Sequence, residues 1–96
     1  MDNIQPTMTI DIFGDKRWRV DGVLHRTDGP AVEYTDGFLA WWVNGRLHRT
    51  DGPAVEDSNG EKRWYLYDNS LSFADWLQQT MGLTEEEKVM FKLQYG

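Results

Sequence analysis

A ten-residue segment that occurs twice without change constrains the fold of this chain more than any other feature. The segment LHRTDGPAVE stands at Leu24–Glu33 and again at Leu47–Glu56, an offset of 23 residues. The same offset relates Trp18 to Trp41 and Trp64. Self-similarity at a fixed spacing is typical of proteins that stack copies of one supersecondary unit. The sequence therefore predicts a repeated unit with one of these tryptophans in each copy.

Short strands separated by glycine turns are expected within each unit. Glycine tolerates positive φ at no steric cost, so Asp-Gly and Asn-Gly pairs favour the tight turns of β-hairpins. Between the turns, residues such as Leu39, Trp41 and Val43 stand at alternate positions, which places them on one face of a strand. This pattern predicts that residues 14–69 form a meander of antiparallel β-hairpins. Residues 1–13 are expected to form an N-terminal strand or cap. The expected turns are Asp21-Gly22, Thr35-Asp36-Gly37, Asn44-Gly45 and Ser58-Asn59-Gly60.

The end of the chain departs from the repeat, and residues 70–96 predict a helical cap. Ser72 and Thr84 are each followed three residues later by an acidic residue, the pattern of a capping box. Gly82 is expected to end the first helix, and the second should run through about Gln94. The side chains expected to face the sheet are Phe73, Trp76, Leu77 and Met81 from the first helix, and Val89, Met90 and Leu93 from the second.

Length and composition favour one soluble domain over residues 1–96, mainly β with a C-terminal α part. The absence of cysteine excludes disulfides, thiolate metal sites and cysteine nucleophiles. The formal net charge of −6 disfavours direct nucleic-acid binding, which needs a local excess of Lys and Arg. Residues 1–10 lack the pattern of a signal peptide, and no run approaches the about 18 apolar residues of a membrane span. A cytoplasmic location without membrane contact is expected.

The run WWVNGRLH at residues 41–48, followed by Gly52 and Asn59-Gly60, resembles a divergent MORN-type repeat. That family has a 23-residue period, an aromatic strand, an Asn-Gly turn and a following His. The resemblance covers roughly residues 14–69, and the HRxDGPA version resembles tandem repeats of large bacteriophages, giant viruses and bacteria. The HRTDGPA segment replaces a shorter glycine-rich stretch of the usual repeat. The resemblance implies a twisted sheet that contacts proteins or, less often, lipid headgroups, and it implies no common catalytic activity.

A His, an Arg and an Asp stand close together in each copy of the repeated segment. Such a trio could form an acid–base site or hold a phosphate. Because the trio recurs in each unit, however, each His is expected to stack on an aromatic ring or bond a turn carbonyl. Each Asp is expected to bond amides of its own turn, and each Arg to pair with that Asp or with Glu33 or Glu56. The residues are His25, Arg26 and Asp28 in one unit and His48, Arg49 and Asp51 in the other.

No metal or other cofactor is expected, because two histidines without cysteine form a thin ligand set. Catalytic motifs such as a phosphate-binding glycine loop or a serine elbow are also missing. Trp42 alternates with Trp41, so it should point to the opposite face of the sheet, in a row with Phe38 and Ala40. Exposed aromatic residues near arginine are typical of protein-binding sites. The residues expected to contact a protein are Phe38, Trp42, Arg46, Glu85, Glu86 and Glu87.

These features favour a non-catalytic, phage-encoded binding protein that inhibits a host protein, such as a component of bacterial immunity. A second hypothesis is a protein that sequesters a signalling nucleotide, with a tryptophan stacked on the base. In that case the small anionic ligand would contact His25, Arg26, His48 and Arg49. An acidic mimic of nucleic acid and a structural protein remain further alternatives. A homodimer is also expected, because an open meander leaves unpaired edge strands and the chain has only two full repeats.

Overall fold

The computed structural model describes residues 5–80 and 82–96, and these residues form ten short strands followed by two helices. The predicted fold, mainly β with a C-terminal α part, is confirmed. The strands are β1 (Thr7–Ile10), β2 (Lys16–Val20), β3 (Val23–Leu24), β4 (Val32–Glu33), β5 (Leu39–Ala40), β6 (Trp42–Val43), β7 (Arg46–Leu47), β8 (Val55–Glu56), β9 (Lys62–Leu66) and β10 (Asn69–Leu71). The helices are α1 (Phe73–Gln79) and α2 (Glu85–Tyr95).

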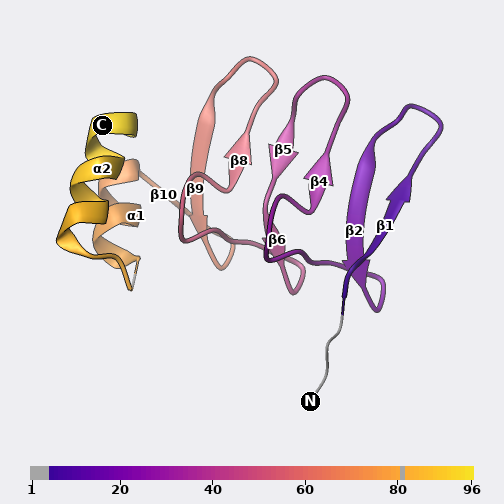
Figure 1. Cartoon of the computed structure of the whole chain (residues 1–96), viewed down its shortest axis with the longest axis horizontal. Helices are drawn as coiled ribbons and strands as arrows, with labels where there is room; N and C mark the ends of the chain where they lie inside the picture. Colours follow the sequence, from indigo (N-terminus) through magenta and orange to yellow (C-terminus); the bar gives the residue numbers. More distant parts are fainter. Residues whose placement is uncertain (1–4, 81) are drawn as a thin grey trace.

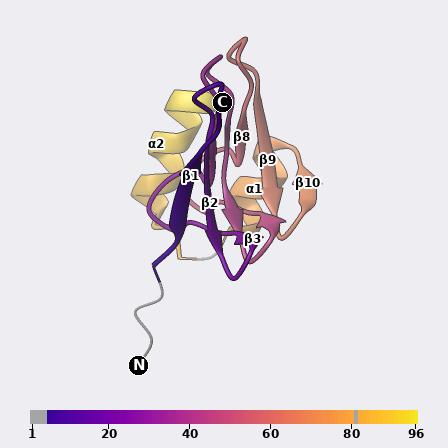
Figure 2. The same ribbon diagram turned by 90° about the vertical axis from the view of Figure 1, so that its right-hand side faces the viewer.

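The strands form an antiparallel meander in which each long hairpin pairs with the next one along the chain. The main sheet has the order β1-β2-β4-β5-β8-β9-β10; β3 pairs with β2, and β6 pairs with β7. The hairpins β1–β2, β4–β5 and β8–β9 stand side by side, and the two helices close the row beyond β9 and β10 (Figure 1). Viewed from the right-hand side of Figure 1, β1 lies in front of the other strands (Figure 2), and among the described strands it pairs only with β2.

Two loop excursions interrupt the meander at the HRTDGP segments. The carbonyl of Trp18 accepts the amide of His25 at 3.0 Å, and the amide of Trp18 donates to the carbonyl of Ala31 at 2.8 Å. One tryptophan thus pairs with residues on both sides of the loop, and residues 26–30 leave the ladder. Trp41 does the same with His48 and Ala54 in the next unit. Each strand therefore continues in register after its excursion, much as across a large β-bulge.

Two-residue turns join the strands at the opposite end of the hairpins. Asp21 and Asn44 have φ of 50° and 52°, and each is followed by a glycine that also has positive φ. This geometry is the one that matches the twist of the flanking strands, and it confirms the two predicted turns. The third such turn has no glycine. Tyr67 and Asp68 occupy it with φ of 49° and 68°, and contacts from the preceding unit hold them there.

Hydrophobic side chains gather in two clusters on opposite faces of the sheet. One cluster is built on the buried residues Val32, Ala40 and Val55, and it contains no helix residue among the described residues. The other joins Trp64 of β9 to Trp76 and Leu77 of α1. The helices therefore pack on the face that carries Trp64, and no helix or strand of residues 5–80 and 82–96 covers the face that carries Val32.

The helix caps follow the predicted pattern, but α2 packs with a different face than expected. Thr84 and Glu87 form a complete capping box, and Ser72 caps α1 by accepting the amide of Asp75. Met81, expected on the inner face of the first helix, lies outside the described residues. The prediction that Val89, Met90 and Leu93 face the sheet is wrong. Their exposed fractions are 53%, 67% and 81%.

The aromatic side of α2 faces the sheet instead. The ring of Phe91 lies 5.4 Å from that of Trp76, and the ring of Tyr95 lies 5.0 Å from that of Trp64, both edge-on. Residues four apart share one face of a helix, so these two contacts fix its orientation. Edge-to-face contacts on two tryptophan rings stabilise this orientation over the aliphatic one.

Candidate functional site

An arginine organises each excursion of the sheet. The Arg26 guanidinium carbon lies 3.8 Å from the centre of the Trp18 ring. Its Nε donates to the Asp28 carboxylate at 3.0 Å, and its Nη1 donates to the Glu33 carboxylate and to the Pro30 carbonyl, each at 3.0 Å. The Arg26 side chain therefore stacks on Trp18 of β2 and bonds both to the loop and to β4, the strand that follows the loop.

The second excursion repeats these contacts. Arg49 lies 3.8 Å from the centre of the Trp41 ring and donates to Asp51 at 2.8 Å, to the Pro53 carbonyl at 2.9 Å and to Glu56 at 3.5 Å. The predicted pairing of the arginines with Asp and Glu is confirmed. The expected bonds from Asp28 and Asp51 to amides of their own turns are wrong, because each carboxylate binds an arginine Nε instead.

The glycine before each proline gives the guanidinium room. A Cβ atom on Gly52 would lie 2.6 Å from the guanidinium carbon of Arg49, and one on Gly29 would lie 3.0 Å from that of Arg26. Neither glycine has the positive φ that would by itself require glycine. The Asp-Gly-Pro sequence is thus explained by close packing, because the arginine is held between the tryptophan ring and the loop backbone.

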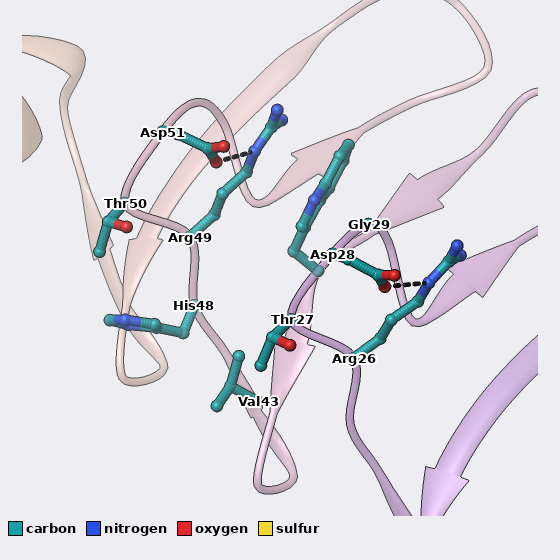
Figure 3. A pocket seen from close by; sticks show the side chains of 10 residues that line it. Arg26, Thr27, Asp28, Gly29, Val43, His48, Arg49, Thr50 and Asp51 are labelled. Carbon is teal, nitrogen blue, oxygen red and sulfur yellow. Dashed lines mark hydrogen bonds and ion pairs between the residues drawn. The ribbon is translucent and has the colours of Figure 1, made fainter. Parts of the chain in front are cut away.

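A cavity of about 590 Å³ lies between the two excursions. Its walls include Arg26, Asp28, Trp41, His48, Arg49 and Asp51, and Figure 3 shows each Asp turned toward the Arg of its own loop. Each arginine there faces two carboxylates, counting Glu33 or Glu56. The local charge is therefore negative in both units. Of the predicted anion-binding residues, the structure brings Arg26, His48 and Arg49 to this cavity, whereas His25 does not line it. The carboxylates offset the positive charge of the two arginines, which disfavours a phosphate ligand.

Both histidines act as hydrogen-bond acceptors, and His48 also lines the cavity. Nδ1 of His25 accepts the amide of Asn44 at 3.0 Å, and Nδ1 of His48 accepts the amide of Tyr67 at 3.1 Å. His48 also stacks on the Tyr67 ring at 4.1 Å, as expected from the sequence, although the turn group it bonds is an amide and not a carbonyl. Burial lowers the pKa of His48, which keeps Nδ1 free to accept. Each His thus holds the turn of the next unit.

The helical cap replaces the arginine in the last unit. Ser72 stands 23 residues after Arg49 and cannot stack on Trp64 as Arg49 stacks on Trp41. Trp76 of α1 takes that place, with ring centres 4.6 Å apart, and its Nε1 donates to the carbonyl of Arg49 at 2.9 Å. The face that carries these tryptophans is therefore closed along its length by arginines and then by α1.

The opposite face of the sheet carries aromatic side chains that remain partly exposed. We call the residues Tyr34, Phe38, Trp42 and Tyr65 the aromatic face; all four pack on the buried cluster of Val32, Ala40 and Val55. The rings of Tyr34 and Phe38 stack with their centres 5.3 Å apart. A shallow cavity of about 270 Å³ lies among Phe38, Trp42 and their neighbours. The aromatic face thus combines large apolar side chains with a hollow that a ligand side chain can enter.

The predicted protein-binding residues divide between different parts of the molecule. Phe38 and Trp42 lie together on the aromatic face, as the strand alternation predicted. Arg46 pairs with Val43 across the β6–β7 hairpin, whereas Trp42 pairs with Leu47, so Arg46 points to the opposite face. Glu85, Glu86 and Glu87 lie in the first turn of α2, where Glu87 completes the capping box and Glu85 lies 3.8 Å from Lys88.

Two members of the aromatic face were missed by the sequence reasoning. Tyr34 lies across the β4–β5 turn from Phe38, and Tyr65 is the repeat counterpart of Trp42. The signal was present in the alternation that begins in β4, because Tyr34, the residue after β4, stands two residues after Val32. Their grouping depends on pairing between strands of different units, which alternation along a single strand does not reveal.

Comparisons with known protein families, with curated proteins and with solved structures found no match for this chain. In the described part of the chain, neither helix has the length and apolar character needed to cross a membrane. Those residues also contain no group of three or more His, Asp or Glu side chains arranged to hold a metal ion.

Proposed function

We propose that this chain is a non-catalytic protein-binding module that contacts its partner through the aromatic face. The observation that carries the proposal is the contrast between the two faces of the sheet. Arginines and α1 close one face, whereas Tyr34, Phe38, Trp42 and Tyr65 lie on the other beneath no described element. Aromatic clusters that are packed on one side and open on the other are typical of the centre of protein interfaces.

The charges around the aromatic face favour a protein over a nucleic acid. Arg17 lies beside Tyr34 but is paired with Asp11 at 3.2 Å, and Arg63 is paired with Asp57 at 3.3 Å. These carboxylates offset the positive charge that a phosphate backbone needs. An apolar side chain of a partner protein, placed in the hollow beside Trp42, needs no positive charge around it.

The contacts of the His, Arg and Asp side chains support a role without catalysis. Each of these residues in the repeated segment has a packing partner inside the fold, and the histidine Nδ1 atoms are engaged as acceptors. A general base must be free to take a proton from a substrate. The structural contacts of these side chains are therefore enough to explain why His, Arg and Asp recur in both units, and no catalytic role is needed.

The kind of partner follows from the resemblance of the HRxDGPA units to those of bacteriophage and giant-virus proteins. On that ground we propose a host protein, such as a component of bacterial immunity, bound and inhibited in the cytoplasm.

Quantitative affinity capture from a bacterial lysate tests the proposal with a variant that the repeat itself supplies. Arg19 occupies the position of Trp42 in the preceding unit, so Trp42→Arg is compatible with the strand. Capture of a stoichiometric protein by the wild-type chain and its loss in Trp42→Arg are the expected results. Leu93→Lys on the exposed side of α2 is the matched control and should retain the partner.

Thermal denaturation of both variants shows that each is folded before the comparison is made. Retention of the captured protein by a folded Trp42→Arg variant would refute the aromatic face as the binding surface. The absence of any stoichiometric protein would count against a host-protein partner.

A further inference from the structure

Strand β1 is a free edge of the main sheet. It stands first in the strand order, and within residues 5–80 and 82–96 it pairs with β2 alone. All four residues of β1 are exposed, and the strand lies at the end of the molecule opposite the helices (Figures 1 and 2). An edge strand presents unpaired amides and carbonyls that can pair with another strand.

The hydrogen bonds of Trp18 identify which backbone groups of β1 point outward. The amide and carbonyl of Trp18 both bond toward β3 and β4, so those of Arg17 and Arg19 point toward β1. Their register partners in β1 are Thr9 and Thr7, which therefore bond to β2. The amides and carbonyls of Met8 and Ile10 consequently point away from the sheet.

The side chains of β1 favour pairing with an apolar strand. Met8 and Ile10 are 41% and 56% exposed, and they lie on the same face as Trp18, the register partner of Met8. Charged residues and β-bulges are two of the features that protect edge strands from pairing, and β1 contains neither. Pro6 precedes it, at a position whose amide would point outward.

We propose that two copies of this chain pair through β1, antiparallel and related by a two-fold axis at Thr9. The amide and carbonyl of Met8 then bond to Ile10 of the partner subunit, and those of Ile10 bond to Met8 of the partner subunit. In this register, every outward-pointing amide and carbonyl of β1 forms a hydrogen bond with the partner subunit. An axis at Met8 would place Ile10 opposite Pro6, which has no amide hydrogen, and an axis at Ile10 would place Met8 opposite Ile12, which lies in the turn.

A second copy fits this edge because the strand is complementary to itself. Two-fold pairing brings the Met8 and Ile10 side chains of both copies into one apolar row next to the two Trp18 rings. On the other face, Asp11 stands opposite Thr7 of the partner subunit, whose neighbour Arg19 has no carboxylate partner among the described contacts. The Asp11 carboxylate, which also pairs with Arg17 of its own chain, thus approaches a second arginine across the junction.

Sedimentation equilibrium of the full chain over a range of concentrations tests the proposal. The wild-type chain is expected to form a dimer, and Ile10→Lys is expected to remain monomeric where the wild type is dimeric. Leu93→Lys places the same charge on the exposed apolar side of α2 and should leave the dimer intact. A monomeric wild-type chain, or a dimer lost in Leu93→Lys and kept in Ile10→Lys, would overturn the proposal.

Amide hydrogen exchange by NMR gives a second test that needs no variant. The amides of Thr7 and Thr9 bond to β2 in either state and should be protected at all concentrations. The amides of Met8 and Ile10 should exchange rapidly in dilute solution and become protected as the concentration rises. Fast exchange of both at concentrations where the chain is dimeric would place the interface elsewhere.

Discussion

Replacing Gly52 with alanine is expected to destabilise the fold by displacing Arg49. The new Cβ would lie 2.6 Å from the guanidinium carbon, a distance at which the side chain must move away from the Trp41 ring. The loss of that cation–π contact costs about 1–2 kcal/mol in a partly buried site. The Pro53 carbonyl, in a buried residue, loses its donor at a further cost of about 1–3 kcal/mol. We therefore expect a decrease of roughly 2–5 kcal/mol in the free energy of unfolding.

Guanidinium chloride denaturation followed by tryptophan fluorescence measures this change, and a double-mutant cycle with Arg49→Ala isolates its cause. Without the arginine there is nothing for the new methyl group to displace, and φ at Gly52 suits an alanine. Gly52→Ala should then be neutral or stabilise the fold by up to about 1 kcal/mol. An equal loss in both backgrounds would refute the argument that Gly52 exists to accommodate Arg49.

The first unit supplies a matched comparison for the same prediction. A Cβ atom on Gly29 would lie 3.0 Å from the Arg26 guanidinium carbon, so the side chain needs to move less. Gly29→Ala should therefore destabilise the fold less than Gly52→Ala. A larger effect at Gly29 would contradict the distances.

Three further predictions follow from the contacts of the excursions and the cap. Burial lowers the pKa of His48 below the ordinary 6.5, so the unfolded chain takes up a proton first and unfolding becomes easier as the pH falls below about 6.5. Denaturation at several pH values should show a smaller dependence in His48→Gln; equal slopes would contradict this. Trp76→Phe keeps a ring against Trp64 but leaves the Arg49 carbonyl without its donor, and it should cost about 1–3 kcal/mol in a thermal or chemical denaturation experiment. Because Asp28 and Asp51 pair with Arg26 and Arg49, cyclic and linear nucleotides at millimolar concentration should leave the melting temperature unchanged, and a clear increase would restore the nucleotide-binding hypothesis.

Local sequence signals accounted for much of the fold. The hairpin turns follow from residues that tolerate positive φ, and the helix starts follow from Ser72 and Thr84, whose hydroxyls reach amides three residues away. Alternation along the strand predicted correctly that Trp42 points away from Trp41. Each of these features depends on residues close together in the chain, so a pattern in the sequence is enough to predict it.

The candidate site could be predicted only in part, because its chemistry depends on which side chains are brought together. The sequence predicted two alternatives for Arg26 and Arg49: pairing with nearby carboxylates, or binding of an anionic ligand. The tertiary structure pairs each with two acids and stacks it on a tryptophan. It also turns Arg46 away from Trp42, although the two residues are only four apart.

The packing of α2 and the role of the histidines were decided entirely by tertiary contacts. Helical spacing allowed either the aliphatic side of α2 or its aromatic side to face the sheet, and the rings of Trp64 and Trp76 stabilise the aromatic one. His48 finds its partner at Tyr67, in the turn of the next unit. The sequence by itself determined the repeated strands, turns and caps, because these depend on local backbone preferences. Only the tertiary structure decided which charges are neutralised and which face stays open, because those depend on contacts between units.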